Sequence, residues 1–204
     1  MNTRSKSILF VVVSAAIVTI GTLSHSAENT AKATFGGGCF WCMEPPFDKL
    51  TGVISTISGY SGGIETSPTY DQVSSGKTGH TEVVQVEYDP QEIHFEELLE
   101  IFWKNIDPFT ADQQFCDRGS QYRSAIYAHD STQLEIAVKS REKLEASDHF
   151  NMPIVTEIEP LKAFYPAEDY HQDYYLKNPI RYRYYRARCG RDTRLRQIWD
   201  SFLP

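Results

Sequence analysis

The sequence predicts a single domain with an α/β (α+β) two-layer sandwich fold. Strand-like and helix-like segments alternate along the chain, and no internal repeat or low-complexity tract interrupts them. Aromatic residues make up 13% of the chain, which argues against disorder. About 177 residues follow the apolar N-terminal segment, and that length suits one domain with a sizeable core.

Residues 1–27 have the pattern of a secretory signal peptide. Arg4 and Lys6 precede an apolar run over 8–20, and small and polar residues follow it. The run is shorter than the ~20 apolar residues of a spanning helix, although an uncleaved membrane anchor is the alternative. We expect a domain over 28–204 that is periplasmic or secreted. It holds 18 basic and 27 acidic residues, a net charge of −9.

The first half of the chain predicts three strands and two helices. Strands are indicated by β-branched residues that end at Gly-rich or Asp-Pro turns. Apolar residues at helical spacing indicate the longer helix, which Pro108 ends. Pro45 and Pro46 fit the first turn of a shorter helix that begins soon after Cys39. In chain order the elements are a strand over 32–35, a helix to about residue 50, strands over 53–60 and 81–88, and a helix over 95–106.

The second half predicts fewer regular elements. A strand over 122–128 is followed by Asp130 and Gln133, whose spacing indicates a helix cap, and the helix runs to about Leu144. Another strand is expected over 154–158. The Tyr-rich and Arg-rich region beyond it is expected to be irregular, except for a short helix over 191–202.

The stretch "GGGCFWCMEPP" holds two of the four cysteines, Cys39 and Cys42. A c-type haem site needs CxxCH, and Met43 stands where the histidine would be. A structural zinc site needs two close ligand pairs, whereas Cys116 and Cys189 stand apart. A structural Cys39–Cys42 disulfide stays open for an exported protein, although so short a loop stabilises little. The remaining interpretation is a reactive thiol.

The surroundings of Cys39 favour a reactive thiol. Three glycines before it leave the thiol uncovered and their amides free. A thiolate just ahead of a helix N-terminus is stabilised, so we expect a lowered pKa for Cys39. Phe40 and Trp41 fit either the core or the wall of an apolar pocket beside that thiol.

"GCFWCMEPPF" resembles the active-site motif of the A-type peptide methionine sulfoxide reductases. The similarity continues through "GYSGG", "PTYDQVSSGKTGHTEVVQVEYDP", "FWKNIDP", "DRGSQYRSAIY", "FYPAEDYHQDYYLKNP" and "RYRYYRARCGRD". It covers residues 34 to about 200 in order. The resemblance implies a mixed, ferredoxin-like sheet and thiol-dependent reduction of methionine (S)-sulfoxide, free or in proteins, to methionine. For this chain it implies repair of oxidised exported proteins with a thioredoxin-like reductant.

The resemblance also implies the roles of individual residues. Cys39 matches the nucleophile, and Glu82 matches the carboxyl that protonates the sulfoxide oxygen. Tyr70 and Tyr122 match the phenols that hydrogen-bond this oxygen. The residues that match the substrate pocket are Phe40 and Trp41 for the methyl group, Asp117 near the substrate backbone, and Tyr174, with Tyr175 as its alternative.

The strand pattern supports Glu82 independently. In a strand over 81–88, Glu82 shares a face with Val84, Val86 and Tyr88. A carboxyl on that apolar face is desolvated, which raises its pKa toward the range of a general acid at neutral pH. If the alternation of side chains were shifted at the first residue of the strand, Glu82 would instead be solvated.

The resolving cysteine is where this sequence departs from the common family pattern. Many members have glycine where Cys42 stands and a resolving cysteine in a Gly-rich C-terminal tail. The candidates to condense with a Cys39 sulfenic acid are, in order of preference, Cys42, Cys189 and Cys116. Cys116 also fits a buried small residue.

The remaining features indicate no cofactor and no metal. The histidines are scattered singly, and His171 is expected near the site as a structural hydrogen-bonding residue. No nucleotide-binding motif is present. The arginines of 181–196 are expected to pair with the protein's own carboxylates rather than with nucleic acid, and the protein is expected to be a monomer. Two rival functions stay open, a thiol–disulfide oxidoreductase and a non-enzymatic peptide-binding module.

Overall fold

The computed structural model describes residues 30–147 and 152–200. The predicted signal peptide over 1–27 lies outside these residues. Within the described ranges, no helix combines the length and the apolar character that crossing a membrane requires. The domain expected from residue 28 onward is thus described from residue 30.

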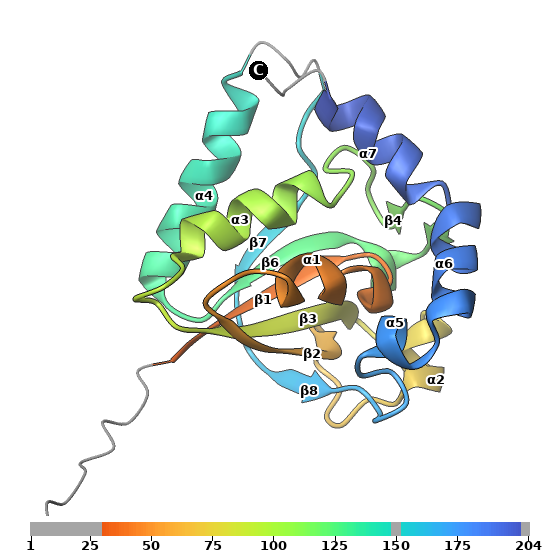
Figure 1. Cartoon of the computed structure of the whole chain (residues 1–204). Coiled ribbons are helices and arrows are strands. Elements are labelled where there is room, and N and C mark those ends of the chain that lie inside the picture. The colour runs from red at the N-terminus through yellow and green to blue at the C-terminus, as the bar shows by residue number, and fades with distance from the viewer. Residues whose placement is uncertain (1–29, 148–151, 201–204) are drawn as a thin grey trace, which may run out of the picture.

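A six-stranded mixed sheet forms the centre of the molecule, in the order β7-β6-β1-β3-β2-β8 (Figure 1). Only β6 and β7 run parallel, and every other neighbouring pair is antiparallel. The predicted α/β sandwich with a mixed sheet is confirmed. The strands are β1 (Ala31–Gly37), β2 (Val53–Ser61), β3 (Thr81–Tyr88), β6 (Ser124–Ala128), β7 (Glu157–Pro160) and β8 (Phe164–Pro166), and a separate hairpin pairs β4 (Gln113–Gln114) with β5 (Asp117–Arg118).

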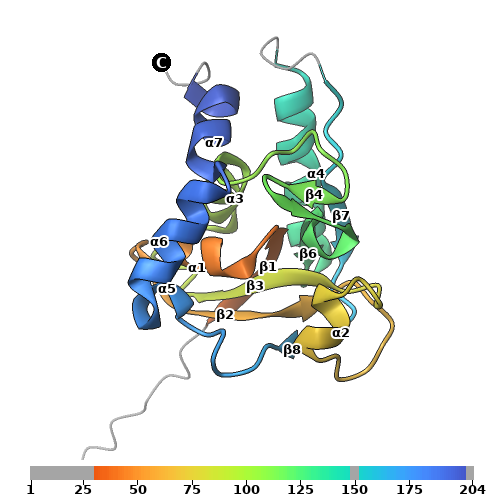
Figure 2. The same ribbon diagram turned by 90° about the vertical axis from the view of Figure 1, so that its right-hand side faces the viewer.

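Helices cover one face of this sheet and enclose the main core. Figures 1 and 2 show α1, α3, α4 and α7 on that side, with α5 and α6 beside them at one end of the sheet. The side chains of β1, β3, α1, α3 and α7 meet there in one apolar cluster. The α-helices are α1 (Glu44–Asp48), α2 (Tyr70–Ser74), α3 (Phe95–Lys104), α4 (Ser131–Glu145), α5 (Tyr174–Lys177), α6 (Pro179–Arg188) and α7 (Arg191–Trp199), and the 3-10 turns are η1 (Phe40–Cys42) and η2 (Ser120–Tyr122).

The strand that carries Glu82 follows its predicted alternation. Val84, Val86 and Tyr88 lie in the main core, whereas Val83 packs on the other face of the sheet. Glu82 therefore faces the helices, and only 2% of its surface is exposed. The alternative of a solvated Glu82 is excluded.

The sequence missed most of the C-terminal architecture. The strand expected over 154–158 lies at Glu157–Pro160, and the region expected to be irregular contains β8, α5 and the ten-residue helix α6. Helix α6 has no fully buried residue and no strong apolar stripe, so helical periodicity could not reveal it. Its position is instead fixed by long-range contacts of its Tyr and Arg side chains.

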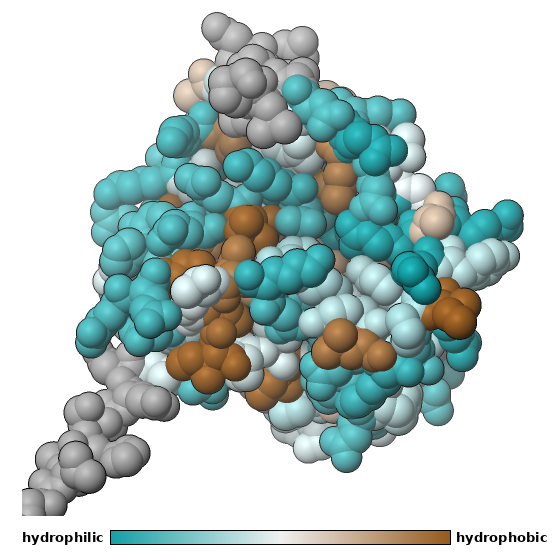
Figure 3. Space-filling model, in the orientation of Figure 1, coloured by the Kyte–Doolittle hydropathy of each residue, from teal (hydrophilic) through white to brown (hydrophobic). Residues whose placement is uncertain are grey.

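The outer surface on the side of Figure 1 is mainly hydrophilic, with smaller hydrophobic groups between the polar residues (Figure 3). Seven large hydrophobic side chains among the described residues are exposed. They are Ile54, Ile64, Met152, Tyr170, Leu176, Ile180 and Tyr184. Four of them lie between 170 and 184, whereas Ile54 is the one that lies on a strand of the sheet.

Candidate active site

Cys39 lies at the turn between β1 and η1, as the triple glycine predicts. Gly38 has φ +80°, in the region that favours glycine, and a Cβ there would lie 2.5 Å from the Cβ of Gln114. The chain then makes the 3-10 turn η1 and enters α1, whose first turn holds Pro45 and Pro46. The glycine turn is confirmed, but the expectation of an uncovered thiol is wrong, because the neighbouring elements pack over Cys39 and leave 7% of its surface exposed.

Cys39 and Cys42 are both free thiols and share a hydrogen bond. Burial, then the hydrogen bond with Cys42 and the charge of Cys42, then the carboxyls of Glu82 and Asp117 raise the pKa of Cys39 well above its usual value. The expectation of a lowered pKa is therefore wrong, because η1 and α1 are too short to offset burial and two nearby carboxyls.

Cys42 has the opposite shift. The hydrogen bond from Cys39, followed by the charges of Arg191 and Arg186, lowers its pKa to about 7 even though burial opposes ionisation. Two interacting thiols titrate as a pair. The pair therefore loses its first proton near neutral pH and holds one negative charge between the two sulfurs.

Glu82 lies directly beside the nucleophile. Its Oε2 accepts a hydrogen bond of 3.1 Å from the amide of Phe40, the residue after Cys39. Burial raises the pKa of Glu82 to about 8, with smaller contributions from the charges of Asp117 and Cys42, while the Phe40 amide opposes the shift. A carboxyl with this pKa is protonated at neutral pH and can donate a proton.

Two tyrosines from distant parts of the chain face the same position. Tyr70 begins α2 and Tyr122 ends η2, and the charges of Glu82 and Cys39 act on both. Burial, the largest cause, raises the pKa of Tyr70 to about 12 and that of Tyr122 still further. Within the described residues neither hydroxyl hydrogen-bonds to another protein group, so both can donate to a ligand.

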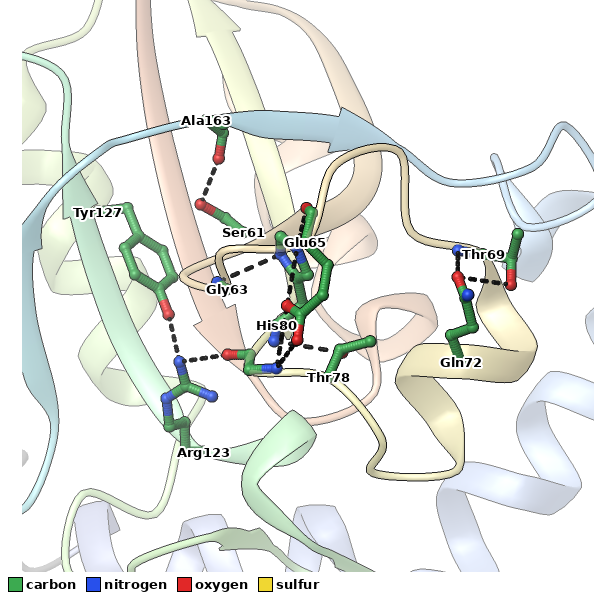
Figure 4. Close-up of polar contacts among 11 residues, drawn as sticks. Ser61, Gly63, Glu65, Thr69, Gln72, Thr78, His80, Arg123, Tyr127 and Ala163 are labelled. Atoms are coloured by element: carbon green, nitrogen blue, oxygen red, sulfur yellow. Dashed lines mark hydrogen bonds and ion pairs between the residues drawn. The ribbon is translucent and has the colours of Figure 1, made fainter.

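The loop over 62–80, which carries α2, is held by polar contacts at the ends of β2 and β3 (Figure 4). The buried His80 donates from Nε2 to the Glu65 carbonyl at 2.8 Å and accepts from the Gly63 amide at 3.3 Å. Arg123 donates to the carbonyl of Gly79 at 3.2 Å. At the other side, Glu168 accepts the Tyr70 amide at 2.9 Å. These contacts hold the loop and the start of α2, where Tyr70 lies, and sequence reasoning did not find them.

Aromatic rings form a wall next to the two thiols. Trp41 stacks on Tyr174 with 3.7 Å between ring centroids and 6° between planes, whereas Tyr175 instead donates to Asp48. The Tyr174 assignment therefore fits the wall and the Tyr175 alternative does not. Trp41 also donates from Nε1 to Nδ1 of His171 at 3.0 Å, and burial lowers the pKa of that histidine. His171 is thus the structural hydrogen-bonding residue that was predicted.

Phe40 occupies the inner side of the same wall. It is 1% exposed, and its ring lies 4.9 Å from that of His171 and 6.1 Å from that of Tyr60. Asp117 lies on β5, where the hydroxyl of Tyr185 donates to its Oδ2 at 2.5 Å. Burial raises the pKa of Asp117. All eight residues predicted for catalysis and substrate binding thus gather around one position, together with Tyr185 and His171.

Cys116 and Cys189 are joined in a disulfide across 73 residues. Cys116 is exposed rather than buried, because it lies in the β4–β5 hairpin, and Cys189 caps the end of α6. In this state Cys42 alone among the three resolving candidates is a thiol. The described residues hold one cluster of three side chains that could bind a metal, Cys116, Asp117 and Cys189, and the disulfide removes both thiolates as ligands.

Comparison with known proteins gives one consistent result. The family model "Peptide methionine sulfoxide reductase" matches residues 31–203. The chain is 51% identical to peptide methionine sulfoxide reductase MsrA of Halalkalibacterium halodurans, over 85% of this chain and 99% of that protein. It is 49% identical to MsrA/MsrB of Vibrio cholerae over 88% of this chain, and it spans 48% of that longer protein.

Solved structures agree with the sequence matches. Mxr1 from Saccharomyces cerevisiae in reduced form is 36% identical with a TM-score of 0.70, over 74% of this chain and 87% of that one. Mxr1 in complex with Trx2 is 26% identical with a TM-score of 0.51, over 76% and 91%. The chain therefore belongs to the A-type peptide methionine sulfoxide reductases and is an oxidoreductase that reduces methionine sulfoxide.

Proposed function

We propose that this enzyme reduces the S epimer of methionine sulfoxide, free or in oxidised exported proteins, through a sulfenic acid on Cys39. The observation that carries the proposal is a 2% exposed Glu82, with a pKa raised to about 8 by burial, one hydrogen bond away from the residue after Cys39. Glu82 is thus a proton donor beside the Cys39 thiol. The aromatic rings next to this thiol suit the methyl group of a thioether.

The first step reduces the substrate. A sulfoxide sulfur is weakly electrophilic until its oxygen is protonated or strongly hydrogen-bonded. Glu82 supplies the proton, and Tyr70 and Tyr122 donate hydrogen bonds to the same oxygen. Cys39 attacks with the negative charge that it shares with Cys42, and its sulfur is oxidised as a Cys39 sulfur–oxygen bond forms and the sulfur–oxygen bond of the substrate breaks. The products are methionine and Cys39–SOH, which retains the oxygen and the proton from Glu82.

The second step forms a disulfide. Cys42 attacks the sulfenic sulfur, water leaves, and a Cys39–Cys42 disulfide results. The hydrogen bond between the two thiols and the lowered pKa of Cys42 support Cys42 as the resolving residue. A dithiol reductant then returns the pair to its starting state. The complex of Mxr1 with Trx2 supports a thioredoxin-like protein in this role.

The test of the main proposal is stereochemical. Purified enzyme with dithiothreitol should consume the S epimer from a racemic methionine sulfoxide mixture and leave the R epimer, as measured by chiral chromatography. A thiol–disulfide oxidoreductase would instead reduce insulin disulfides with no dependence on sulfoxide. A peptide-binding module would leave both epimers unchanged, and persistence of the S epimer would contradict the proposal.

The compartment is a separate proposal, and it rests on the N-terminal sequence alone. The order of basic, apolar and small residues over 1–27 supports export with cleavage near Ser26 or Ala27. N-terminal sequencing of the protein recovered from the periplasmic or culture fraction should begin near residue 28. Full-length protein in the membrane fraction would favour the anchor, and full-length protein in the cytosol would contradict export.

A further inference from the structure

Arg191, at the start of α7, is a buried cation without a carboxylate partner. It is 1% exposed, and no carboxylate of the described residues lies within 4.0 Å of it. The other buried or half-buried arginines nearby are paired, Arg186 with Asp192 and Arg194 with Asp107. Arg191 is the exception to the expectation that this segment pairs with the protein's own carboxylates.

The partners of Arg191 are neutral groups on both sides of the thiol pair. Its Nη2 donates to the carbonyl of Gly37 at 3.0 Å and contacts the sulfur of Met43 at 2.8 Å. It also donates to the carbonyl of Asn105 at 2.7 Å, while Nε has no partner. A Cβ built on Gly38 would lie 3.7 Å from Nη1. The guanidinium therefore bonds to residues that precede Cys39 and follow Cys42.

A full charge in such a position is unfavourable unless an opposite charge compensates it. Burial lowers the pKa of Arg191, while the charges of Cys42 and Cys39 raise it. The same attraction lowers the pKa of Cys42. The thiolate of the Cys39–Cys42 pair is therefore the anion that can compensate the charge of Arg191.

Other charges face the thiol pair from the surrounding elements. Glu82 on β3 and Asp117 on β5 oppose ionisation, and Arg186 on α6 favours it but is already paired with Asp192. The phenols of Tyr182 and Tyr185 also face the pair from α6. Arg191 also attracts the charge of Asp117, but among the described residues it is the one cation near the pair that forms no ion pair with a carboxylate.

We propose that Arg191 is the buried counter-ion of the negative charge that Cys39 and Cys42 share, and that it acts on the reaction through these thiols as a positioning residue. The inference rests on the proposed function, in which this pair is the redox centre. Helix α7 presents Arg191 inward because Leu195 and Ile198, at helical spacing from it, are buried in the core.

The test measures thiol ionisation and not sulfoxide reduction. Reduced protein is alkylated with iodoacetamide, a neutral probe, from pH 5 to 10, and mass spectrometry separates Cys39 from Cys42. The midpoint of the more reactive thiol should rise by about one pH unit in Arg191→Met. It should change little in Arg191→Lys, which keeps the charge, and in Arg196→Met, which removes an exposed charge from the same helix.

Two outcomes overturn the proposal. One is a folded Arg191→Met protein with the wild-type midpoint, and the other is Arg191→Lys shifted as far as Arg191→Met. If Arg191→Met does not fold, an NMR titration of the wild type provides the test instead. The ¹⁵N–Hε resonance of Arg191 should then titrate with the alkylation midpoint and lose this titration in Cys42→Ser, and a resonance that stays constant overturns the proposal. Failure of the sulfoxide assay would leave these readouts unaffected.

Discussion

Cys39→Ser should form no methionine from methionine sulfoxide, even within a single turnover, whereas Cys42→Ser should form one equivalent per enzyme and then stop. Serine at position 39 has no thiolate to accept oxygen from the substrate. Serine at position 42 leaves that step intact but cannot condense with the sulfenic acid, so a thioredoxin-like donor meets no disulfide to reduce. Rapid-quench chromatography gives the methionine formed per enzyme.

The control for this pair of variants is Cys116→Ser with Cys189→Ser, which removes the second pair of cysteines. If Cys42 resolves the intermediate, the double variant should keep turnover with the donor. Full donor-driven turnover in Cys42→Ser would contradict the assignment and move it to Cys189 or Cys116. Mass spectrometry of the disulfide formed after one equivalent of substrate identifies the residue used.

Glu82→Gln should lower kcat by about 10²- to 10⁴-fold, the usual contribution of a general acid. Glutamine can still accept the Phe40 amide but has no proton to transfer. The acid works in its protonated form, so kcat of the wild type should fall as the pH rises through about 8. The variant should lack this falling limb. Stopped-flow single turnovers from pH 6 to 10 measure both effects, and a variant with the same falling limb would exclude Glu82 as the acid.

The raised pKa of Glu82 also makes the stability of the folded protein depend on pH. The pKa of Glu82 is raised in the folded state from 4.5 to about 8. Its contribution is therefore fully present below pH 4.5 and is lost as the pH rises through about 8. At pH 9, where the wild type must hold a buried carboxylate, Glu82→Gln should unfold at a higher urea concentration than the wild type. Catalytic function thus costs stability at this position.

Glu44→Gln is the matched control for Glu82. Glu44 is also buried, at 1% exposure, and burial raises its pKa to about 7, but its Oε1 accepts from the hydroxyl of Ser58 and not from the turn after Cys39. Its substitution should shift the pH dependence of stability in the same direction as Glu82→Gln. It should leave kcat within a few fold of the wild type. An equal loss of kcat in both variants would indicate a general effect of buried carboxyls rather than an acid at position 82.

Local pattern predicted those elements whose own residues decide their structure. Asp130 accepts the Gln133 amide at 2.8 Å as the cap of α4, because the two groups lie three residues apart in one helical turn. The alternation of β3 placed Glu82 on the helical face, since the period of a strand is fixed. The local sequence pattern did not predict helix α6, because distant residues hold its side chains in place, as in the contact of Tyr185 with Asp117.

The sequence by itself determined the mixed α/β sandwich, the thiol on its glycine turn, the buried Glu82 and, through its motifs, the family. Tertiary structure decided the electrostatics of that thiol. Burial beside Glu82 and Asp117 raises the pKa of Cys39, and Arg191, 149 positions after Cys42 in the chain, favours ionisation of Cys42. It also joined Cys116 to Cys189. The reason is physical: desolvation and Coulomb interaction depend on which groups meet in space, and a local sequence pattern carries information only about neighbours along the chain.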